Sequence, residues 1–290
     1  MEITLLFFSI ILKGELLLKD SIPLKDYKVT FYELDSTLSL IDSSFTKTDH
    51  EGKFLFKNDK KGIYIVKVNY QNVRYRTDPI LKDDDKIRLS VYDTVSNYEQ
   101  MVLQRAHIAF IPSPGLIQVI EVYNFFNAHN KTVKREFRIP LPHNATHIFS
   151  PQGVLPFEFK LIENSFIYKE GFKPGLKTIS LLYHLTFDKI KFERKIPFIT
   201  NEFLIMLPKE LELKTKINFE KENLQTPQGN FSVYSFKNLK ANEILSFEIK
   251  VKKDEGLKNF IPPFLLLILF LIFLLFIFRR KWKKKEVISE

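Results

Sequence analysis

The sequence predicts an all-β ectodomain made of two β-sandwich-like domains, followed by one C-terminal transmembrane α-helix. Two observations carry this prediction. From Lys13 to Lys253, short runs of alternating apolar and polar residues recur roughly every ten residues between turn-forming Gly, Pro, Asn and Asp, which is typical of β-sandwiches. After them comes one uncharged apolar segment that is long enough to cross a bilayer.

Residues 1–12 are predicted to be a signal leader. The apolar run Ile3–Leu12 is too short to span a membrane, but it suits the apolar region of a secretory signal. It lacks the usual basic residues before it and a small-residue cleavage site after it. An apolar first β-strand is the alternative interpretation of the same run.

Residues 13–93 are predicted to form the first sandwich. In the segments KVTFYE and YIVKVNY the side chains alternate between apolar and polar, as a sheet with one solvated face requires. The predicted strands are Glu15–Leu18, Tyr27–Glu33, Ser44–Thr48, Lys53–Lys57, Ile63–Asn69, Val73–Thr77 and Ile87–Tyr92.

Three segments of this region follow one another in a characteristic order: GELLLKDSIPLKDYKVTFYELD, TKTDHEGKFLFKN and KGIYIVKVNYQNVRYRTDPI. They include a strand opened by Gly, a proline-bearing turn and a Thr-Asp-x-x-Gly-x-Phe hairpin formed around Thr48, Asp49, Gly52 and Phe54. In this order they resemble the carboxypeptidase regulatory-like (prealbumin-like) domain family. The resemblance implies a β-sandwich, and the whole design resembles bacterial envelope proteins with such a head and a C-terminal anchor.

The hairpin residues have physical roles that follow from their types. Asp49 is expected to accept hydrogen bonds from backbone amides of the turn, Gly52 to adopt a positive φ, and Phe54 to fill the core. Domains of this family accompany many unrelated modules, so the resemblance implies a fold and no activity. The zinc-binding His-x-x-Glu motif of the carboxypeptidases themselves is absent from the sequence.

A linker over Thr94–Glu99 leads to residues 101–253, which are predicted to form a second, larger antiparallel β domain of two packed sheets. Proline-bearing turns such as IPSPG and SPQGVLP separate its strands. The predicted strands are Ile108–Phe110, Ile117–Phe125, Val133–Ile139, Phe157–Leu161, Phe166–Lys169, Lys177–Phe187, Lys191–Pro197, Phe203–Leu207, Leu213–Phe219, Phe231–Phe236 and Ile244–Val251.

Residues 260–278, FIPPFLLLILFLIFLLFIF, are predicted to be the transmembrane helix. They carry no charge, and as a helix they would reach about 28 Å, close to the thickness of a bilayer core. Pro262 and Pro263 fall in the first turn, where proline is tolerated. No GxxxG pattern offers a pairing face, so the helix is expected to act as a tether.

The tail 279–290 is predicted to be cytoplasmic. Its basic cluster, directly after the span, comprises Arg279, Arg280, Lys281, Lys283, Lys284 and Lys285. Positive residues beside a span stay on the cytoplasmic side. We therefore expect a single-pass protein of the cytoplasmic membrane, with its N-terminal bulk outside and the lipid bilayer as one partner.

Composition argues against several classes of function. The 290 residues contain no cysteine, which rules out disulfides, thiolate nucleophiles and cysteine-bound metals. The net charge of +10 includes +4 from the tail (six basic residues less Glu286 and Glu290), and the remainder forms no dense basic stripe. No nucleic-acid partner is therefore expected. No Gly-rich phosphate loop or other cofactor motif is present, so no cofactor is expected.

Two candidate metal sites can be weighed from spacing. His143 and His147 would share a helix face, but Pro140 and Pro142 favour an extended segment, in which the two lie about 13 Å apart. The acidic run Asp83–Asp85 could hold calcium, but it lacks the spacing of an EF-hand loop and reads as a solvated turn. No metal is therefore expected at either place.

Tyr64, Tyr70 and Tyr75 could form a platform on which sugars stack, provided that Tyr70 and Tyr75 are exposed; Tyr64 is expected in the core. The leading hypothesis is a membrane-anchored, extracytoplasmic binding or assembly module without catalytic activity, with an envelope protein as its unidentified partner. A hydrolase or metal-dependent enzyme whose residues meet only in the fold is one alternative. A carbohydrate-binding module is the other.

Overall fold

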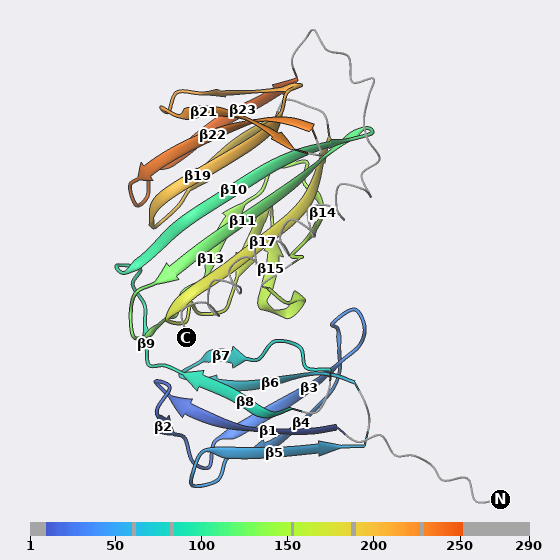
Figure 1. Ribbon diagram of the computed structural model, residues 1–290, viewed down its shortest axis with the longest axis vertical. Coiled ribbons are helices and arrows are strands. Elements are labelled where there is room, and N and C mark those ends of the chain that lie inside the picture. The colour runs from blue at the N-terminus through green and yellow to red at the C-terminus, as the bar shows by residue number, and fades with distance from the viewer. Residues whose placement is uncertain are drawn as a thin grey trace, which may run out of the picture.

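The computed structural model describes residues 10–59, 62–81, 84–151, 154–186, 190–226 and 229–251. They form two β domains that follow one another along the long axis of the molecule (Figure 1), which confirms the predicted all-β sandwich class. The helical element among them is a 3-10 turn, η1, at Pro156–Glu158. No helix within these ranges is long and apolar enough to cross a membrane. The predicted span 260–278 and the basic tail 279–290 lie outside the described residues.

The first domain, which we call the head, packs two four-stranded sheets face to face. In one sheet β1 lies at the centre, with β5 antiparallel on one side and with β2 and the parallel strand β8 as its other partners. The other sheet has the order β4-β3-β6-β7. The strand bounds are β1 (Ile10–Leu18), β2 (Ile22–Pro23), β3 (Lys28–Leu34), β4 (Leu40–Lys47), β5 (Lys53–Asn58), β6 (Ile63–Tyr70), β7 (Val73–Arg76) and β8 (Asp84–Val91).

Alternation along the strands builds the core of the head. Val29 and Phe31 of β3 point inward and are almost completely buried, as Val66 of the neighbouring β6 is. Phe54 of the opposite sheet meets them, and the ring of Phe31 stacks on that of Phe56 with 4.2 Å between centroids. The period of two in the sequence therefore marks the buried face.

The head includes Ile10–Leu12, which the sequence prediction assigned to the leader. Ile10 and Leu12 are 2% and 0% exposed, and they pair with Asn58 and Phe56 of β5. An apolar run has the same composition whether it is a buried strand or a signal segment, so the boundary at residue 13 could not be placed from composition. Residues 1–9 lie outside the described part of the chain.

The second domain is built on a seven-stranded sheet of order β14-β17-β11-β10-β19-β22-β21. Its pairs are antiparallel except β10 with β19, which is parallel and differs from the predicted antiparallel domain. The strand bounds are β10 (Met101–Ser113), β11 (Leu116–Asn127), β14 (Thr146–Phe149), β17 (Gly175–Thr186), β19 (Ile199–Pro208), β21 (Glu220–Thr226) and β22 (Gly229–Leu239).

Smaller sheets complete this domain. The order is β13-β16-β15 in one and β18-β23-β20 in another. The strand β9, which falls in the predicted linker, pairs in parallel with β12 of this domain. Phe125 lies at the centre of the core. The centroid of its ring is 4.9, 5.0 and 5.4 Å from the ring centroids of Phe137, Phe172 and Phe198. The bounds are β9 (Thr94–Val95), β12 (Thr132–Val133), β13 (Phe137–Pro140), β15 (Phe159–Ile162), β16 (Ser165–Tyr168), β18 (Ile190–Lys195), β20 (Leu211–Thr215) and β23 (Ile244–Val251).

Candidate functional site

The residues of the predicted hairpin motif make contacts within the head. Asp49 accepts a hydrogen bond from the backbone N–H of Lys53 at 2.8 Å, and Gly52 has a φ of +75°. Phe54 is 4% exposed and Thr48 is 5% exposed. These contacts hold the turn and the core, and they direct no group toward a ligand.

Two predicted groups lie wholly or partly outside the described residues. The basic cluster Arg279, Arg280, Lys281, Lys283, Lys284 and Lys285 is one of them. The acidic run Asp83–Asp85 is the other, because β8 begins at Asp84 and the description of the side chains begins after Asp85. The topological and calcium hypotheses therefore stay predictions.

The histidines have separate surroundings. His143 Nδ1 lies 2.5 Å from the side-chain nitrogen of Asn164, whereas the ring of His147 lies 5.4 Å from that of His184 between centroids. Burial, and then the nearby His147, lowers the pKa of His184. No three His, Asp or Glu side chains gather into a possible metal site within the described ranges.

The alternative of a tyrosine platform requires Tyr70 and Tyr75 to be exposed together, and the structure contradicts this because Tyr75 is 0% exposed. Tyr64 is 1% exposed, as expected for a core residue. Alternation in β7 places Val73 and Tyr75 on the same buried face, so Tyr75 cannot stand beside Tyr70 as a second exposed ring. The Tyr75 hydroxyl instead accepts or donates a hydrogen bond at 2.7 Å with the hydroxyl of Thr132, in the second domain.

A group of buried and half-buried polar side chains lies between β7 of the head and the second domain. Figure 1 shows β7 on the side of the head that faces the second domain. The two domains contribute residues that are far apart in the sequence. We call the group the interdomain joint, and it consists of Arg74, Tyr75 and Arg76 from β7 and of Thr132, Glu158, Glu170 and Lys173 from the second domain.

The central contact of the joint is a two-pronged ion pair between Arg76 and Glu158. Arg76 Nε donates to Glu158 Oε1 at 2.6 Å, and Nη2 donates to Oε2 at 2.8 Å. Their side chains are 13% and 6% exposed. Burial alone would raise the pKa of Glu158, but the hydrogen bonds and charge of Arg76 outweigh it, so the pKa is lowered.

A second ion pair joins Glu170 to Arg74, which lies two residues before Arg76 on β7. Arg74 Nε donates to Glu170 Oε2 at 3.0 Å, and a second guanidinium nitrogen contacts Oε1. The Glu170 side chain is 5% exposed, and its burial raises its pKa although Arg74 opposes this. Arg74 and Arg76 therefore leave β7 on one face while Tyr75 leaves it on the other, and both faces contact the second domain.

Lys173 completes the charged part of the joint. Its amine lies 5.0 Å from the centre of the Tyr75 ring, which is within cation–π range. Burial, followed by the positive charges of Lys177 and Arg76, lowers the pKa of Lys173 to about 8. A fraction of this amine is therefore neutral near pH 7, unlike that of an ordinary surface lysine.

Apolar contacts support the ion pairs. Leu34 and Ile65 of the head form a buried cluster with Leu155, and Phe157 packs edge-on against the ring of Tyr32 at 6.4 Å. The second domain thus contacts the head through polar and charged groups at β7 and through apolar groups at β3 and β6. The sequence offered no signal for these pairs, because each joins residues separated by more than eighty positions.

A second buried polar cluster lies in the core of the second domain. Glu121 is 0% exposed, and its Oε1 accepts a hydrogen bond from Arg194 Nη2 at 2.6 Å. The hydroxyls of Tyr123 and Tyr183 also donate to the two oxygens of Glu121. Burial, reinforced by the Glu121 charge, raises the pKa of both tyrosines well above its usual value. Every member of this cluster is enclosed.

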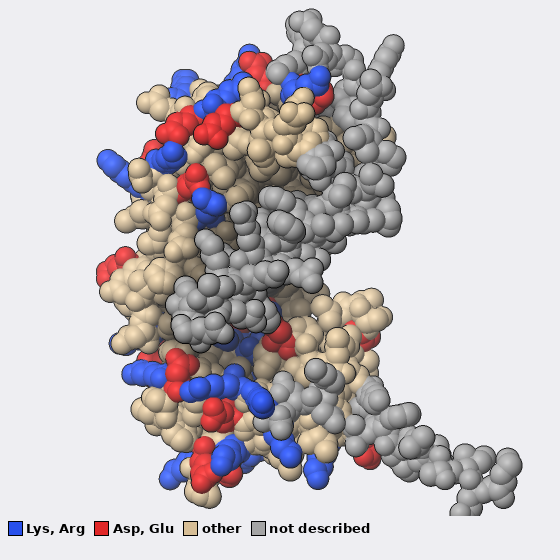
Figure 2. All heavy atoms as spheres, in the orientation of Figure 1, with Lys and Arg blue, Asp and Glu red and all other residues tan. Residues whose placement is uncertain are grey.

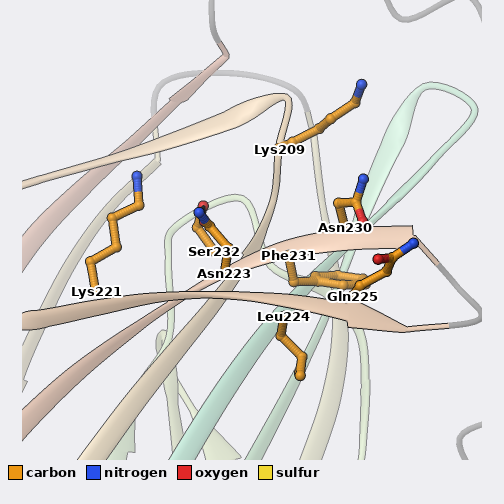
Figure 3. A pocket seen from close by; sticks show the side chains of 8 residues that line it. All are labelled: Lys209, Lys221, Asn223, Leu224, Gln225, Asn230, Phe231 and Ser232. Atoms are coloured by element: carbon orange, nitrogen blue, oxygen red, sulfur yellow. Dashed lines mark hydrogen bonds between the residues drawn. The ribbon is translucent and has the colours of Figure 1, made fainter.

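Two cavities on the described surface are large enough to consider as ligand sites. One, of about 480 Å³, lies at β21 and β22 (Figure 3). In that view Lys209 and Lys221 direct their amines to the same side, while Leu224 points away. The residues that line it are Lys209, Lys221, Asn223, Leu224, Gln225, Asn230, Phe231 and Ser232. This lining has amines, amides and a hydroxyl, and it contains no carboxylate or histidine.

The other cavity, of about 570 Å³, lies on the outer face of the head, over β3, β4 and β6. Figure 2 shows charged side chains of both signs mixed over the visible face of both domains. The residues that line the second cavity are Asp26, Tyr27, Lys28, Thr30, Tyr32, Ser43 and Asn69.

Comparison with known proteins assigns no family. No protein-family model and no curated protein matches the sequence. Among solved structures, an M1 zinc metallopeptidase from Deinococcus radiodurans is similar at 8% identity, with a TM-score of 0.33, over 52% of this chain and 42% of that chain. A mutant of it bound to a Tyr-Ser-Ala substrate gives 7% identity, a TM-score of 0.33 and coverage of 52% and 43%.

This chain thus spans less than half the length of the peptidase chains that it matches. A TM-score at this level assigns neither a family nor an activity. The resemblance of the head to the carboxypeptidase regulatory-like domain therefore stays a prediction.

Proposed function

We propose that the protein is a non-catalytic binding or assembly module of the cell envelope. Its two β domains are held outside the cytoplasmic membrane by residues 260–278, and the basic cluster in 279–290 fixes their orientation. The observation that supports this function best is the interdomain joint, in which two ion pairs connect β7 of the head with the second domain.

The state of the buried acids supports a structural role for them. An acid or base in catalysis must exchange a proton with its substrate, so one side of it faces a ligand space. Glu158 and Glu170 are each held by an arginine of β7, and Glu121 is enclosed by Arg194 and two tyrosines. The carboxylates of these residues accept hydrogen bonds from other side chains of the protein and not from a ligand.

Membrane attachment is tested with the full chain expressed in a Gram-negative host. We expect it to stay in the membrane pellet after alkaline carbonate extraction, and protease added to spheroplasts should remove the head and second domain. A chain ended after Val251 should leave the pellet. Retention of that shorter chain in the extracted pellet, or protection of the full chain from external protease, would contradict the proposed topology.

The binding role is tested by site-specific photo-crosslinking of the full chain in its own membrane. A photoreactive residue on the exposed surface of the head, at Lys57 or Leu55, should yield discrete adducts, whereas the same residue at buried Val66 should yield none. Turnover of any envelope substrate by the purified full chain that one polar substitution abolishes would overturn the non-catalytic assignment.

A further inference from the structure

The outer face of the head sheet β4-β3-β6-β7 carries several cationic side chains, and the second domain contacts part of this face. Residues that pair directly across neighbouring strands share one face of a sheet. Thr30 of β3 pairs with Lys67 of β6, which pairs with Arg76 of β7. Lys67 therefore lies on the same face as Arg76, whose guanidinium binds Glu158 of the second domain.

Lys28 belongs to the same patch of this face. It stands two positions before Thr30 on β3, so its side chain leaves the strand on the same side. Because Thr30 pairs with Lys67, Lys28 is a diagonal neighbour of Lys67, at about 7–8 Å. The irregularity in the pairing of β3 with β4 falls between Glu33 and Leu34, beyond these positions. Regular pairing therefore places both lysines over one part of the sheet.

Within the described part of the chain, neither lysine has a carboxylate at ion-pair distance. Lys28 Nζ lies 4.2 Å from the centre of the exposed Phe45 ring, and Lys67 Nζ donates a hydrogen bond to the hydroxyl of Tyr32 at 2.9 Å. The two arginines of β7, by contrast, each bind a glutamate of the second domain. The same sheet face thus binds two carboxylates of the protein itself and leaves two amines for carboxylates from outside.

The cavity over β3, β4 and β6, which we call the groove, lies beside these amines, and Lys28 and Tyr32 are part of its lining. Its volume of about 570 Å³ falls in the range of small-ligand sites, about 300–1,000 Å³. The described lining offers hydroxyls, an amine, an amide and one carboxylate, and it has no Ala, Val, Leu, Ile or Met. The carboxylate, Asp26, already accepts a hydrogen bond from the Lys47 amine at 2.9 Å. The groove therefore suits a polar ligand with negative charge.

We propose that the groove binds a glycan whose sugar units carry carboxylates. The two lysine amines hold the carboxylates through charge-assisted hydrogen bonds. Sugar hydroxyls both donate and accept hydrogen bonds, and the hydroxyl of Thr30 and the side-chain amide of Asn69 can do the same. The apolar face of a sugar ring packs on an aromatic ring, which Tyr27 and Tyr32 supply in the lining.

The lining favours a glycan over an acidic peptide. The centre of a protein-binding site is rich in apolar groups and poor in lysine, which is the reverse of this groove. The aromatic rings are also held in place before a ligand binds, which lowers the entropy cost of binding. The Tyr27 hydroxyl donates to the backbone oxygen of Asn69 at 2.9 Å, and Phe157 packs edge-on against Tyr32. The groove does not use Tyr75, so the burial of that residue does not affect it.

Calorimetric titration of the full chain in detergent with tetragalacturonate tests the class of ligand. We expect saturable binding that weakens as the salt concentration rises, because salt screens the attraction between carboxylates and amines. Maltotetraose, which is neutral, and tetraglutamate, which is an acidic peptide, should each bind about tenfold more weakly or less. Absence of tetragalacturonate binding, or equally tight binding of maltotetraose or tetraglutamate, would overturn the proposal.

Substitution of the two lysines tests the place of binding. Lys28→Gln combined with Lys67→Gln should weaken tetragalacturonate binding about tenfold or more, whereas Lys28→Arg combined with Lys67→Arg should preserve it. The matched control Lys221→Gln removes an amine that lies 5.3 Å from the centre of the Tyr234 ring at the other cavity, and it should leave the affinity unchanged. Urea unfolding checks that each variant is folded. An equal loss of affinity in the control and in the glutamine variant would show that net charge, and not the groove, binds the glycan.

This inference rests on the proposed function, because it gives the binding module a class of ligand. The two can fail separately, since carbonate extraction and external protease report the membrane topology without any glycan. A chain that has the expected topology and does not bind tetragalacturonate overturns the ligand alone. A chain that binds tetragalacturonate while its β domains face the cytoplasm overturns the proposed location alone.

Discussion

Glu121 and Arg194 occupy positions that the strand pattern reserves for apolar side chains. Along β11 the inward series is Ile117, Val119, Glu121, Tyr123 and Phe125, so the carboxylate interrupts an apolar row. Arg194 does the same in β18, after Phe192. The two interruptions meet across the core as an ion pair at 2.6 Å. A charge on the buried face of a predicted strand was therefore visible in the sequence, and its partner was not.

Removing one member of this pair should be severe. Glu121→Gln keeps the size and the acceptor for one tyrosine, but it leaves the buried Arg194 charge without its counter-charge. We expect the free energy of unfolding in urea to fall by about 3–5 kcal/mol. Lys237→Gln, which removes a surface pair with Glu220, is the control and should change little. An equal loss in both variants would show that burial is not the cause.

Gly14 is needed for close packing and not for an unusual backbone. A Cβ at this position would lie 2.2 Å from the carbonyl oxygen of Ile87 and 2.6 Å from Phe54 Cζ. We expect Gly14→Ala to lower the free energy of unfolding by about 2 kcal/mol or more, because β8 must move away from β1. Urea unfolding of both variants measures this, and Gly62→Ala, whose added Cβ would lie 3.3 Å from its nearest atom, is the control that should lose less stability.

At the scale of elements, β7 is a short strand whose role comes from what covers it. Its four residues place Arg74 and Arg76 on one face and Val73 and Tyr75 on the other. The strand was predicted from its alternation, but its docking was not, because the partners follow in a different domain. Covering an edge strand also protects its free backbone groups from pairing with other chains. The other edge strand of this sheet, β4, pairs with β3 alone among the described strands.

A double-mutant cycle should measure the Arg76–Glu158 pair. We expect the losses in free energy of unfolding caused by Arg76→Gln and Glu158→Gln to be non-additive by about 1–3 kcal/mol in urea unfolding. The reason is that each change leaves the other charged side chain without its partner. The exposed pair Lys160 with Glu136 is the matched control, with its two charges 3.0 Å apart, and should be nearly additive. If the free-energy losses of the Arg76 and Glu158 variants add within error, the pair does not stabilise the protein in the way proposed.

The same pair predicts a pH dependence. The pKa of Glu158 is lowered in the folded protein, so its contribution is fully present above its unfolded pKa of about 4.5 and is lost as pH falls through the lower folded value. The difference in stability between the unmodified chain and Glu158→Gln should therefore shrink on acidification below pH 4.5, when followed by urea unfolding at several pH values. A difference that grows on acidification would reverse the assigned sign.

Some elements of the fold could be predicted from the sequence and others could not. The head strands were found because one face of each is apolar, and this period is local. The strand β21 was missed because all its side chains are polar or exposed, so no alternation marks it. The predicted strand Val133–Ile139 is divided into β12 and β13, since Val133 bridges to Phe172 while Phe137 joins another sheet.

At the scale of the whole molecule, the interdomain joint should make the two domains unfold together. We expect one calorimetric transition for the described domains, because exposing the joint leaves buried charges and apolar side chains without partners. Arg76→Glu would set two carboxylates against each other and should separate the trace into two transitions. Arg138→Glu, at an exposed position of β13, is the control and should keep one transition. Two transitions in the unmodified chain would contradict a rigid unit.

The sequence by itself determined the all-β class, most of the strands and the apolar segment at 260–278, because each depends on a pattern of neighbouring residues. Tertiary structure alone decided which edge of the head sheet is covered, which acids meet which arginines, and that Tyr75 joins two domains instead of facing solvent. These outcomes depend on contacts such as Arg76 with Glu158, separated by 82 positions, and Glu121 with Arg194, separated by 73. Local periodicity shows which face of a strand is buried, but packing chooses what lies against it.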